Sequence, residues 1–149
     1  MTYEKLKRAV DAGLFDLDLC DIVAPPVEAD IVRAEKSLGI AFSPEHRALL
    51  LEWGGSDLHE IVIHAPDQVH VEDGMIEFAA DYAGSLFHYA PDEGGAVYAD
   101  DVQSGETILL AASLPEFIDE VLLGAKGEDF YGEDWVRELQ VLGLTAPRN

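Results

Sequence analysis

The spacing of apolar residues changes at Gly54-Gly55, and this change restricts the folds that the chain can adopt. Before the glycine pair, apolar residues recur every three or four positions, as on the buried face of a helix. After the pair they form short runs bounded by turn residues, as strands do. Helical spacing returns after Ser113. The spacing therefore predicts helices at both ends of the chain and short strands in the middle.

The N-terminal part contains three predicted helices, at residues 3–10, 27–38 and 44–53. Four apolar residues of the second helix form one stripe: Val27, Ile31, Ala34 and Leu38. The third helix begins with Ser43 as its N-cap and Pro44 at its first position. A glycine, which commonly ends helices, follows each of the three: Gly13, Gly39 and Gly54.

Six short β-type runs follow, at residues 61–63, 69–71, 75–80, 86–89, 97–99 and 107–111. Asp73-Gly74, between the second and third runs, is typical of a tight hairpin turn. Runs this close together favour an antiparallel meander. Ser113 and Glu116 then form a capping-box pattern that opens a helix through Leu122, and a final helix starts at about Asp134.

The charge pattern is one-sided, because no Lys or Arg occurs between Arg47 and Lys126. The same stretch carries sixteen acids: Glu52, Asp57, Glu60, Asp67, Glu72, Asp73, Glu77, Asp81, Asp92, Glu93, Asp100, Asp101, Glu106, Glu116, Asp119 and Glu120. The whole chain has 9 Lys and Arg against 30 Asp and Glu, a formal net charge of −21. Internal ion pairs cannot neutralise such a block, so it predicts a cationic partner, with a purely solubilising role as the alternative.

Composition excludes several classes of protein. Nucleic acids and anionic membranes are poor partners, because both attract proteins through cationic patches. A length of 149 residues with 48% hydrophobic content predicts one folded domain, residues 1–149. Cys20 is the single cysteine, which excludes an intrachain disulfide and a cysteine zinc cluster. With no secretion signal or apolar run of ~20 residues, we expect a cytoplasmic protein.

The histidines do not match a metal motif. His59 and His64 are five residues apart, whereas the zinc-protease motif needs an offset of four on one helix. In a β-rich run, an odd offset places two side chains on opposite faces. His64, His70 and His88 could converge across strands, but strand histidines are more commonly surface or capping residues. We therefore predict no metal site.

Other catalytic patterns are incomplete. Asp16, Asp18 and Asp21 resemble the start of a calcium loop but lack its glycine at position six and glutamate at position twelve. Ser56 has no Gly-x-Ser-x-Gly context, and no phosphate-binding loop is present. We expect a protein that is not an enzyme and has no cofactor. A carboxylate pair for glycoside hydrolysis stays an alternative, because proximity in space is not visible in a sequence.

Acidic residues mixed with aromatic ones indicate a candidate partner-binding surface. The predicted contact residues are Asp81, Tyr82, Tyr89, Asp92, Glu93, Asp100 and Asp101, and Phe87 and Tyr98 belong to the same mixture. A second acidic and aromatic cluster comprises Asp129, Tyr131, Glu133 and Asp134. For the tyrosines at 82, 89 and 98 the alternative is a core position with a satisfied hydroxyl group. For the acids it is a solvated loop.

Five segments carry a resemblance to a known family. They are an amphipathic helix with Ile31, Glu35, Leu38 and Gly39; a Pro-led helix from Pro44 to Gly54; a strand with Ile76, Phe78 and Ala79 followed by Asp81 and Gly84; Val97-Tyr98 with Asp100; and a helix with Ser113 and Phe117. In their order and spacing, from about residue 27 to 124, they resemble the SUKH (Smi/Knr-like) superfamily. Trp53 departs from the pattern, since the family more often has Asn there.

The resemblance implies an α+β fold, with a twisted antiparallel sheet of about six strands and helices packed on one side, between N- and C-terminal helical extensions. The superfamily includes yeast regulators of cell-wall synthesis and bacterial immunity proteins. The bacterial members are typically small and acidic, and they silence a polymorphic toxin encoded beside them, in many cases a nuclease.

We therefore expect a cytoplasmic immunity protein that binds and neutralises a cationic toxin domain, which would suit the acidic block because nucleases hold phosphates with cations. The alternatives are an intracellular scaffold or regulatory module that binds another protein, and an acidic hydrolase. Whether the chain is a monomer or a dimer stays open.

Overall fold

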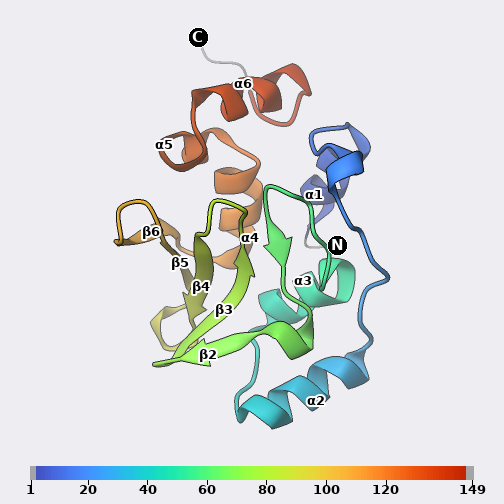
Figure 1. Ribbon diagram of the computed structural model, residues 1–149, viewed down its shortest axis with the longest axis vertical. Helices are drawn as coiled ribbons and strands as arrows, with labels where there is room; N and C mark the ends of the chain where they lie inside the picture. Colours follow the sequence, from blue (N-terminus) through green and yellow to red (C-terminus); the bar gives the residue numbers. More distant parts are fainter. Residues whose placement is uncertain (1–2, 147–149) are drawn as a thin grey trace.

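The computed structural model describes residues 3–146, which form one six-stranded sheet with helices around it (Figure 1). The strands are β1 (Val62–Ile63), β2 (His70–Glu72), β3 (Met75–Ala80), β4 (Leu86–Ala90), β5 (Ala96–Asp100) and β6 (Thr107–Ala111). The helices are α1 (Glu4–Asp11), α2 (Glu28–Leu38), α3 (Pro44–Trp53), α4 (Leu114–Glu116), α5 (Glu128–Tyr131) and α6 (Glu133–Val141). The predicted α+β fold is confirmed.

The helix ends follow the local chemistry of the sequence. Gly39 ends α2 with a φ of 69°, a left-handed conformation that suits a residue without a Cβ atom. The Ser43 side chain accepts a hydrogen bond from the His46 N–H and caps α3, with Pro44 at the first position as predicted. In α2, Ile31 and Ala34 are buried, whereas Val27 lies before the helix and is 62% exposed.

All pairs in the sheet are antiparallel, but the topology departs from the predicted meander at one strand. Strands β2 to β6 form the meander, whereas β1 pairs with the second half of β3 and not with β2. A 3-10 turn at Pro66–Gln68, in which Pro66 is buried, separates β1 from β2. Asp73-Gly74 forms the hairpin turn between β2 and β3 with positive φ angles of 52° and 78°, as the pattern predicts.

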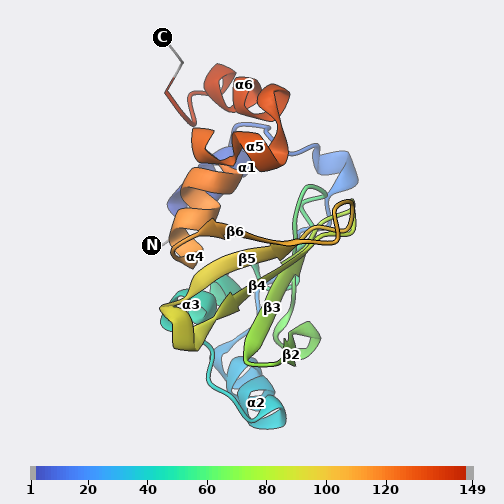
Figure 2. The ribbon, with the colours of Figure 1, turned by 90° about the vertical axis from the view of Figure 1, so that its left-hand side faces the viewer.

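The two faces of the sheet differ, because side chains alternate along each strand. One cross-strand row, Ile76, Tyr89, Val97 and Ala111, faces the core, and α3 and α4 lie on that side (Figure 2). The next row, Glu77, His88, Tyr98 and Leu109, lies on the other face. We call this second face the open face, since Leu109 on it is 61% exposed. Helices α5 and α6 lie beyond one end of the sheet and α2 beyond the other (Figure 1).

The helix after Ser113 begins as predicted but continues as a π-helix. The Ser113 side chain accepts from the Glu116 N–H, and the Glu116 carboxylate accepts from the Ala112 N–H, one residue earlier than in a regular capping box. Residues Phe117–Leu122 then continue α4 as a π-helix. The final helix starts at Glu133, close to the predicted Asp134. Helix α5 was not predicted, because four residues are too few to show a helical period.

One histidine lies inside the core. His46 on α3 is fully buried, and its Nδ1 lies 2.8 Å from the hydroxyl oxygen of Tyr89 on β4. That hydroxyl also accepts a hydrogen bond from the Ser43 N–H, so its own proton is free for His46. Burial, together with nearby His64, lowers the pKa of His46 to about 3. His46 is therefore neutral in the folded protein near neutral pH.

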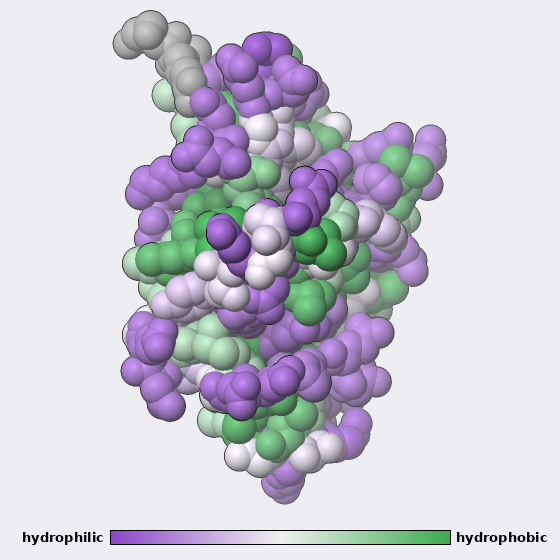
Figure 3. Space-filling view, turned by 60° about the vertical axis from the view of Figure 1, so that its left-hand side comes forward, coloured by the Kyte–Doolittle hydropathy of each residue, from purple (hydrophilic) through white to green (hydrophobic). Residues whose placement is uncertain are grey.

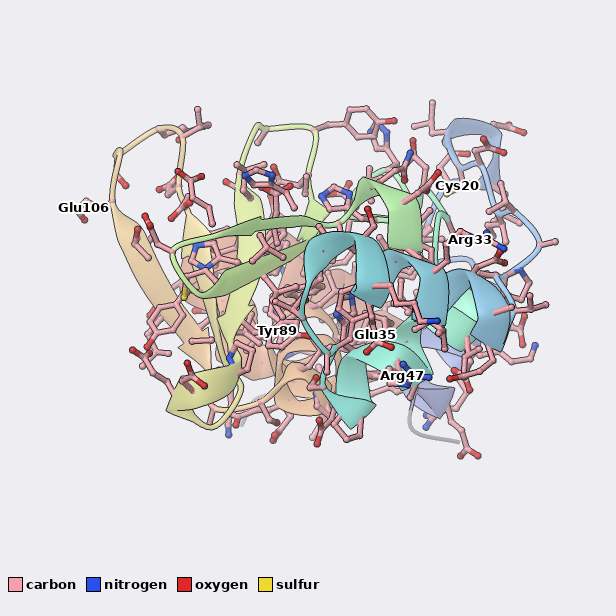
Figure 4. All side chains as sticks on the ribbon, turned by 90° about the horizontal axis from the view of Figure 1, so that it is seen from below. Cys20, Arg33, Glu35, Arg47, Tyr89 and Glu106 are labelled. Carbon is pink, nitrogen blue, oxygen red and sulfur yellow. The ribbon has the colours of Figure 1, made fainter. Side chains whose placement is uncertain are left out.

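The cations of residues 3–146 all lie in helical segments, and none lies in the sheet or its turns. They are Lys5, Lys7 and Arg8 in α1, Arg33 and Lys36 in α2, Arg47 in α3, Lys126 in the 3-10 turn Ala125–Gly127, and Arg137 in α6. Arg47 contacts Glu28 and Glu35 and so links α3 to α2; Figure 4 shows Glu35 and Arg47 side by side, whereas Glu106 projects from the far edge of the molecule. The sheet therefore keeps its acids without internal cations.

Gly127 is needed for a close approach between two segments. A Cβ atom at this position would lie 1.8 Å from the carbonyl oxygen of Val121. We expect Gly127→Ala to lower the free energy of unfolding by about 2 to 3 kcal/mol, because the two backbones must separate. Gly143→Ala is the control: its φ of +73° disfavours alanine, but no atom lies within 4 Å, so we expect a loss of about 1 kcal/mol. Equal losses in thermal unfolding would contradict the steric explanation.

The buried His46 makes stability depend on pH. The unfolded chain binds a proton on this group near pH 6.5, whereas the folded state binds it only near pH 3. Its contribution to stability is thus complete above pH 6.5 and is lost progressively as the pH falls towards 3. Relative to His46→Gln, which keeps an acceptor for Tyr89, the native protein should lose up to about 1.4 kcal/mol per pH unit in this window. Urea unfolding from pH 7 to pH 4 measures the difference, and the exposed-histidine variant His70→Gln should retain the native pH dependence.

Candidate functional site: an acidic cleft

A cleft of about 390 Å³ lies at the end of the sheet where the β3–β4 and β5–β6 turns meet α5. Four segments line it: the 57–62 loop with His59 and Glu60, the β3–β4 turn with Asp81, Tyr82, Ala83 and Ser85, the β5–β6 region with Asp101, Gln103 and Ile108, and α5 with Asp129, Phe130 and Tyr131. We call this the acidic cleft, because its lining includes four carboxylates and no Lys or Arg.

The β3–β4 turn is held by its own carboxylate. The Asp81 N–H donates to the Ser85 carbonyl oxygen at 3.0 Å, and the Ser85 N–H donates to Asp81 Oδ1 at 2.9 Å. A short side chain that accepts from a nearby backbone N–H is a common reason for Asp in turns. These bonds place the next residue, Tyr82, at the exposed tip of the turn, where its side chain is 61% exposed.

Tyr82 connects the turn to the 57–62 loop. Its hydroxyl donates a short hydrogen bond to the Asp57 carboxylate, and its ring centroid lies 4.8 Å from that of His59. The hydrogen bond to Asp57 is the main cause that raises the pKa of the Tyr82 phenol. Asp57 also accepts from the His59 N–H at 2.8 Å, and His59 has a positive φ of 71°. Asp57 thus fixes one wall of the cleft.

Aromatic packing holds α5 against the sheet. The Phe130 ring lies 5.8 Å from that of Phe87 on β4, and the Tyr131 ring lies 6.1 Å from that of Trp135 on α6. Trp135 in turn donates from Nε1 to the Leu122 carbonyl oxygen at 2.7 Å. These contacts determine where the Tyr131 and Asp129 side chains of α5 lie relative to the turns of the sheet.

The Tyr131 hydroxyl group is buried and has no hydrogen-bond partner among residues 3–146. Burial raises the pKa of this phenol, and the carboxylates of Asp81 and Glu60 raise it further. The hydroxyl group therefore lies in the field of two acids of the same cleft. A buried polar group without a partner is costly, so the position of Tyr131 requires an explanation.

The four carboxylates of the cleft differ in what they already bind. Asp81 holds its own turn, and Asp101 accepts from the Gln103 N–H and the Ser104 hydroxyl group. The carboxylates of Glu60 and Asp129 have no hydrogen bond or ion pair within residues 3–146. Two of the four acids are thus available to a cationic group that enters the cleft.

The structure brings the two predicted clusters together in part. Asp81, Tyr82 and Asp101 of the first cluster line the same cleft as Asp129 and Tyr131 of the second. Antiparallel strands place the β3–β4 and β5–β6 turns at one end of the sheet, and α5 follows the helix that covers the sheet. This convergence does not follow from the sequence, because it depends on the path of the chain.

The placement of Tyr89 in a partner surface is wrong. Tyr89 is 1% exposed and lies in the core-facing row of the sheet, where its hydroxyl group is satisfied by Ser43 and His46. Phe87, from the same mixture, is fully buried. The physical reason is strand alternation, which turns residues 87 and 89 of β4 inward and His88 outward.

The remaining predicted residues lie elsewhere. Asp92 and Glu93 are in the 3-10 turn between β4 and β5, at the opposite end of the strands, where Glu93 accepts from the Tyr98 hydroxyl group at 2.9 Å. Asp100 is on the open face, where it binds His88 and Thr107. Glu133 and Asp134 pair with Arg137 on α6.

Sequence reasoning missed Glu60 and His59 as lining residues, since it counted Glu60 only as one acid of the charge block and considered His59 only as part of a metal motif. No signal in the sequence shows that they face α5. The three histidines lie around Glu77: His64 Nε2 is 2.9 Å from its carboxylate, and His70 and His88 are its register partners on β2 and β4. Within residues 3–146 no group of three or more His, Cys, Asp or Glu side chains is arranged to hold a metal ion.

Neither the family models nor the curated proteins with which the chain was compared include a match. No helix of residues 3–146 combines the length and apolar character that crossing a bilayer requires. The chemistry of the candidate site is therefore the basis for a functional proposal. Carboxylates with no internal cation, beside a buried hydroxyl group, fit a cationic group of a partner.

Two tyrosine variants test the state of the Tyr131 hydroxyl group. We expect Tyr131→Phe to raise the free energy of unfolding by about 1 kcal/mol, because it removes a buried polar group that has no partner. Tyr89→Phe is the matched control and should lower it by about 1 to 2 kcal/mol, because it leaves His46 and the Ser43 N–H without their partner. Urea unfolding at pH 7 measures both. A similar loss in both variants would mean that the Tyr131 hydroxyl group is satisfied in the folded protein.

Proposed function

We propose that this chain is an immunity protein that binds a cationic toxin domain, most readily a nuclease, and neutralises it in the bacterial cytoplasm. The observation that carries the proposal is the acidic cleft, with two carboxylates that have no partner within residues 3–146 and with no Lys or Arg in its lining. The sheet beside it also contains no cation. A surface of this kind loses free energy to self-repulsion unless a cationic partner covers it.

A nuclease is a suitable partner for a chemical reason. Its active surface must be cationic to hold phosphates, so an acidic protein can occupy the same surface in place of the nucleic acid. Complementary charge also speeds encounter, towards ~10⁸ to 10⁹ M⁻¹s⁻¹ at low salt against ~10⁵ to 10⁶ for neutral pairs. Fast capture suits an inhibitor that must act before its toxin does damage.

The resemblance to the SUKH superfamily supports the same proposal, because it implies both this fold class and this function. The six-stranded antiparallel sheet agrees with the fold that the resemblance implies. The proposal includes that the protein is not an enzyme, and the resemblance supports this part as well.

Titration calorimetry tests the proposal directly. The chain is titrated with the toxin domain encoded by the adjacent gene, at low and at high salt, while toxin activity is followed. We expect tight binding that weakens with salt and abolishes activity. Binding without loss of activity would instead favour a scaffold or regulatory module, and no binding at either salt concentration would overturn the proposal.

The two unpaired carboxylates of the cleft give a kinetic prediction. With Glu60→Gln and Asp129→Asn combined, we expect association with the toxin domain to slow by about three- to tenfold at low salt, with a smaller change in dissociation. The control combines Asp18→Asn and Glu138→Gln, which removes the same charge outside the cleft. Stopped-flow measurements at two salt concentrations separate a local effect from a general one. Equal slowing in the two double variants would exclude the cleft as the contact site.

A further inference from the structure

Two further hollows lie near the acidic cleft. A hollow of about 440 Å³ beside the β5–β6 turn shares Asp101 with the cleft, and Val102 lines it. A third, of about 420 Å³ on the open face, shares Leu86, Asp100 and Thr107 with the second. The acidic cleft lies on the α5 side of the sheet and the other two hollows lie on the open face, and they meet at Asp101 at the end of the sheet; we call the three together the anionic groove. Figure 3, which looks towards the β6 side, shows apolar and hydrophilic side chains interspersed on this face of the molecule.

The groove follows the strands along the open face. Its part on the open face begins at the row of Leu86, Asp100 and Thr107, next to the cleft, and ends at the β2–β3 turn with Glu72 and Asp73. From the level of Leu86 to that of Ala90, four residues of β4 span ~14 Å at ~3.4 Å per residue. An extended peptide of about five residues covers the same length.

The chemistry of the groove changes along its length. Carboxylates lie at both ends, in the acidic cleft and at Glu72, Asp73 and Glu77. Between them are the apolar side chains of Leu86 and Val102, which are 38% and 58% exposed, together with the carboxylates of Asp100 and Asp101. No Lys or Arg of residues 3–146 lines any part of it. Acids therefore occur along the whole groove, and Leu86 and Val102 form an apolar patch at its centre.

Two residues of the groove lining each contain a buried polar atom without a partner among residues 3–146. At the cleft end it is the Tyr131 hydroxyl oxygen. On the open face it is Nδ1 of His88, a residue that is 8% exposed and lines the third hollow. His88 Nε2 lies 3.1 Å from Asp100 Oδ1, so one ring nitrogen of His88 has a hydrogen-bond partner and the other has none.

We propose that the anionic groove docks a segment of the cationic partner that presents an apolar side chain between two basic ones. The basic side chains meet the acids at the two ends, and the apolar one covers Leu86 and Val102. This inference rests on the proposed function and specifies the contact that the partner makes. Charge complementarity selects this occupant over a second copy of the chain, because each copy carries a formal net charge of −21.

A peptide series tests the groove with the full-length chain. The first peptide is an acetylated, amidated Lys-Ser-Ser-Leu-Ser-Ser-Lys, in which leucine lies between the two lysines. One analogue replaces Leu with Ser, and another replaces both Lys with Gln. Backbone amide shifts in NMR titrations at low salt report both the affinity and the location of binding.

We expect the first peptide to shift amides at both ends of the groove, around Asp101 and around Glu72. The Leu→Ser analogue should bind at least threefold more weakly, and the Lys→Gln analogue about tenfold more weakly or not at all. Shifts confined to one end, or equal affinity for the first peptide and the Leu→Ser analogue, would overturn the inference. So would failure of all three peptides to bind while the toxin domain binds tightly.

A variant pair applies the same test to the toxin domain. Val102→Ser removes an apolar side chain from the centre of the groove, and Val141→Ser removes one that is 75% exposed on α6, outside the lining. We expect the first to weaken binding at least fivefold, mainly through faster dissociation, and the second to leave it unchanged. Equal affinity of the two variants for the toxin domain would overturn the proposed groove. Tight binding that inhibits the toxin would still support the immunity role in that case. Loss of all binding in the native protein would instead reject the proposed function.

Discussion

A continuous series of ring contacts connects nearly every layer of this protein. It runs from the loop before α3, through α3, the sheet, the π-helix and α5, to α6 and the loop after α1: Phe42, His46, Tyr89, Phe78, Phe117, Phe87, Phe130, Tyr131, Trp135 and Phe15. Tilted and edge-to-face pairs of this kind stabilise more than their buried area alone. The series also positions the cleft, because its members Phe130 and Tyr131 lie in the lining.

Charge is distributed as unevenly in space as it is in the sequence. The cations of residues 3–146 lie in helical segments, where Arg47 and Lys126 pair with nearby acids. The sheet and its turns contain Asp and Glu but no Lys or Arg, so the repulsion between these acids is not offset inside the fold. The antiparallel topology then places two acidic turns at the same end of the sheet, which concentrates the charge in the acidic cleft. An uneven composition thus becomes a local site.

Much of the fold could be predicted from local chemistry. The caps at Ser43 and Gly39 and the hairpin at Asp73-Gly74 depend on neighbouring residues, and each was found where the pattern predicted it. The pairing of β1 with β3 and the π-helix after α4 could not be predicted, because they depend on contacts between segments distant in the sequence. For the site, Tyr89 shows the same limit: its type suits both a surface and a core, and only the strand register shows that it faces inward.

Local patterns were enough to predict the order of most helices and strands, most of their ends, and a sheet without cations, because periodicity, capping and residue type act over a few positions. Which acids share a surface depends instead on how the distant segments pack. Asp81, Asp101 and Asp129 are distant along the chain and meet because two turns and α5 are packed at one end of the sheet. The same packing left Glu60 and the Tyr131 hydroxyl group without partners among residues 3–146. Convergence of this kind is a property of the folded chain, since it depends on long-range packing that local residue patterns do not encode.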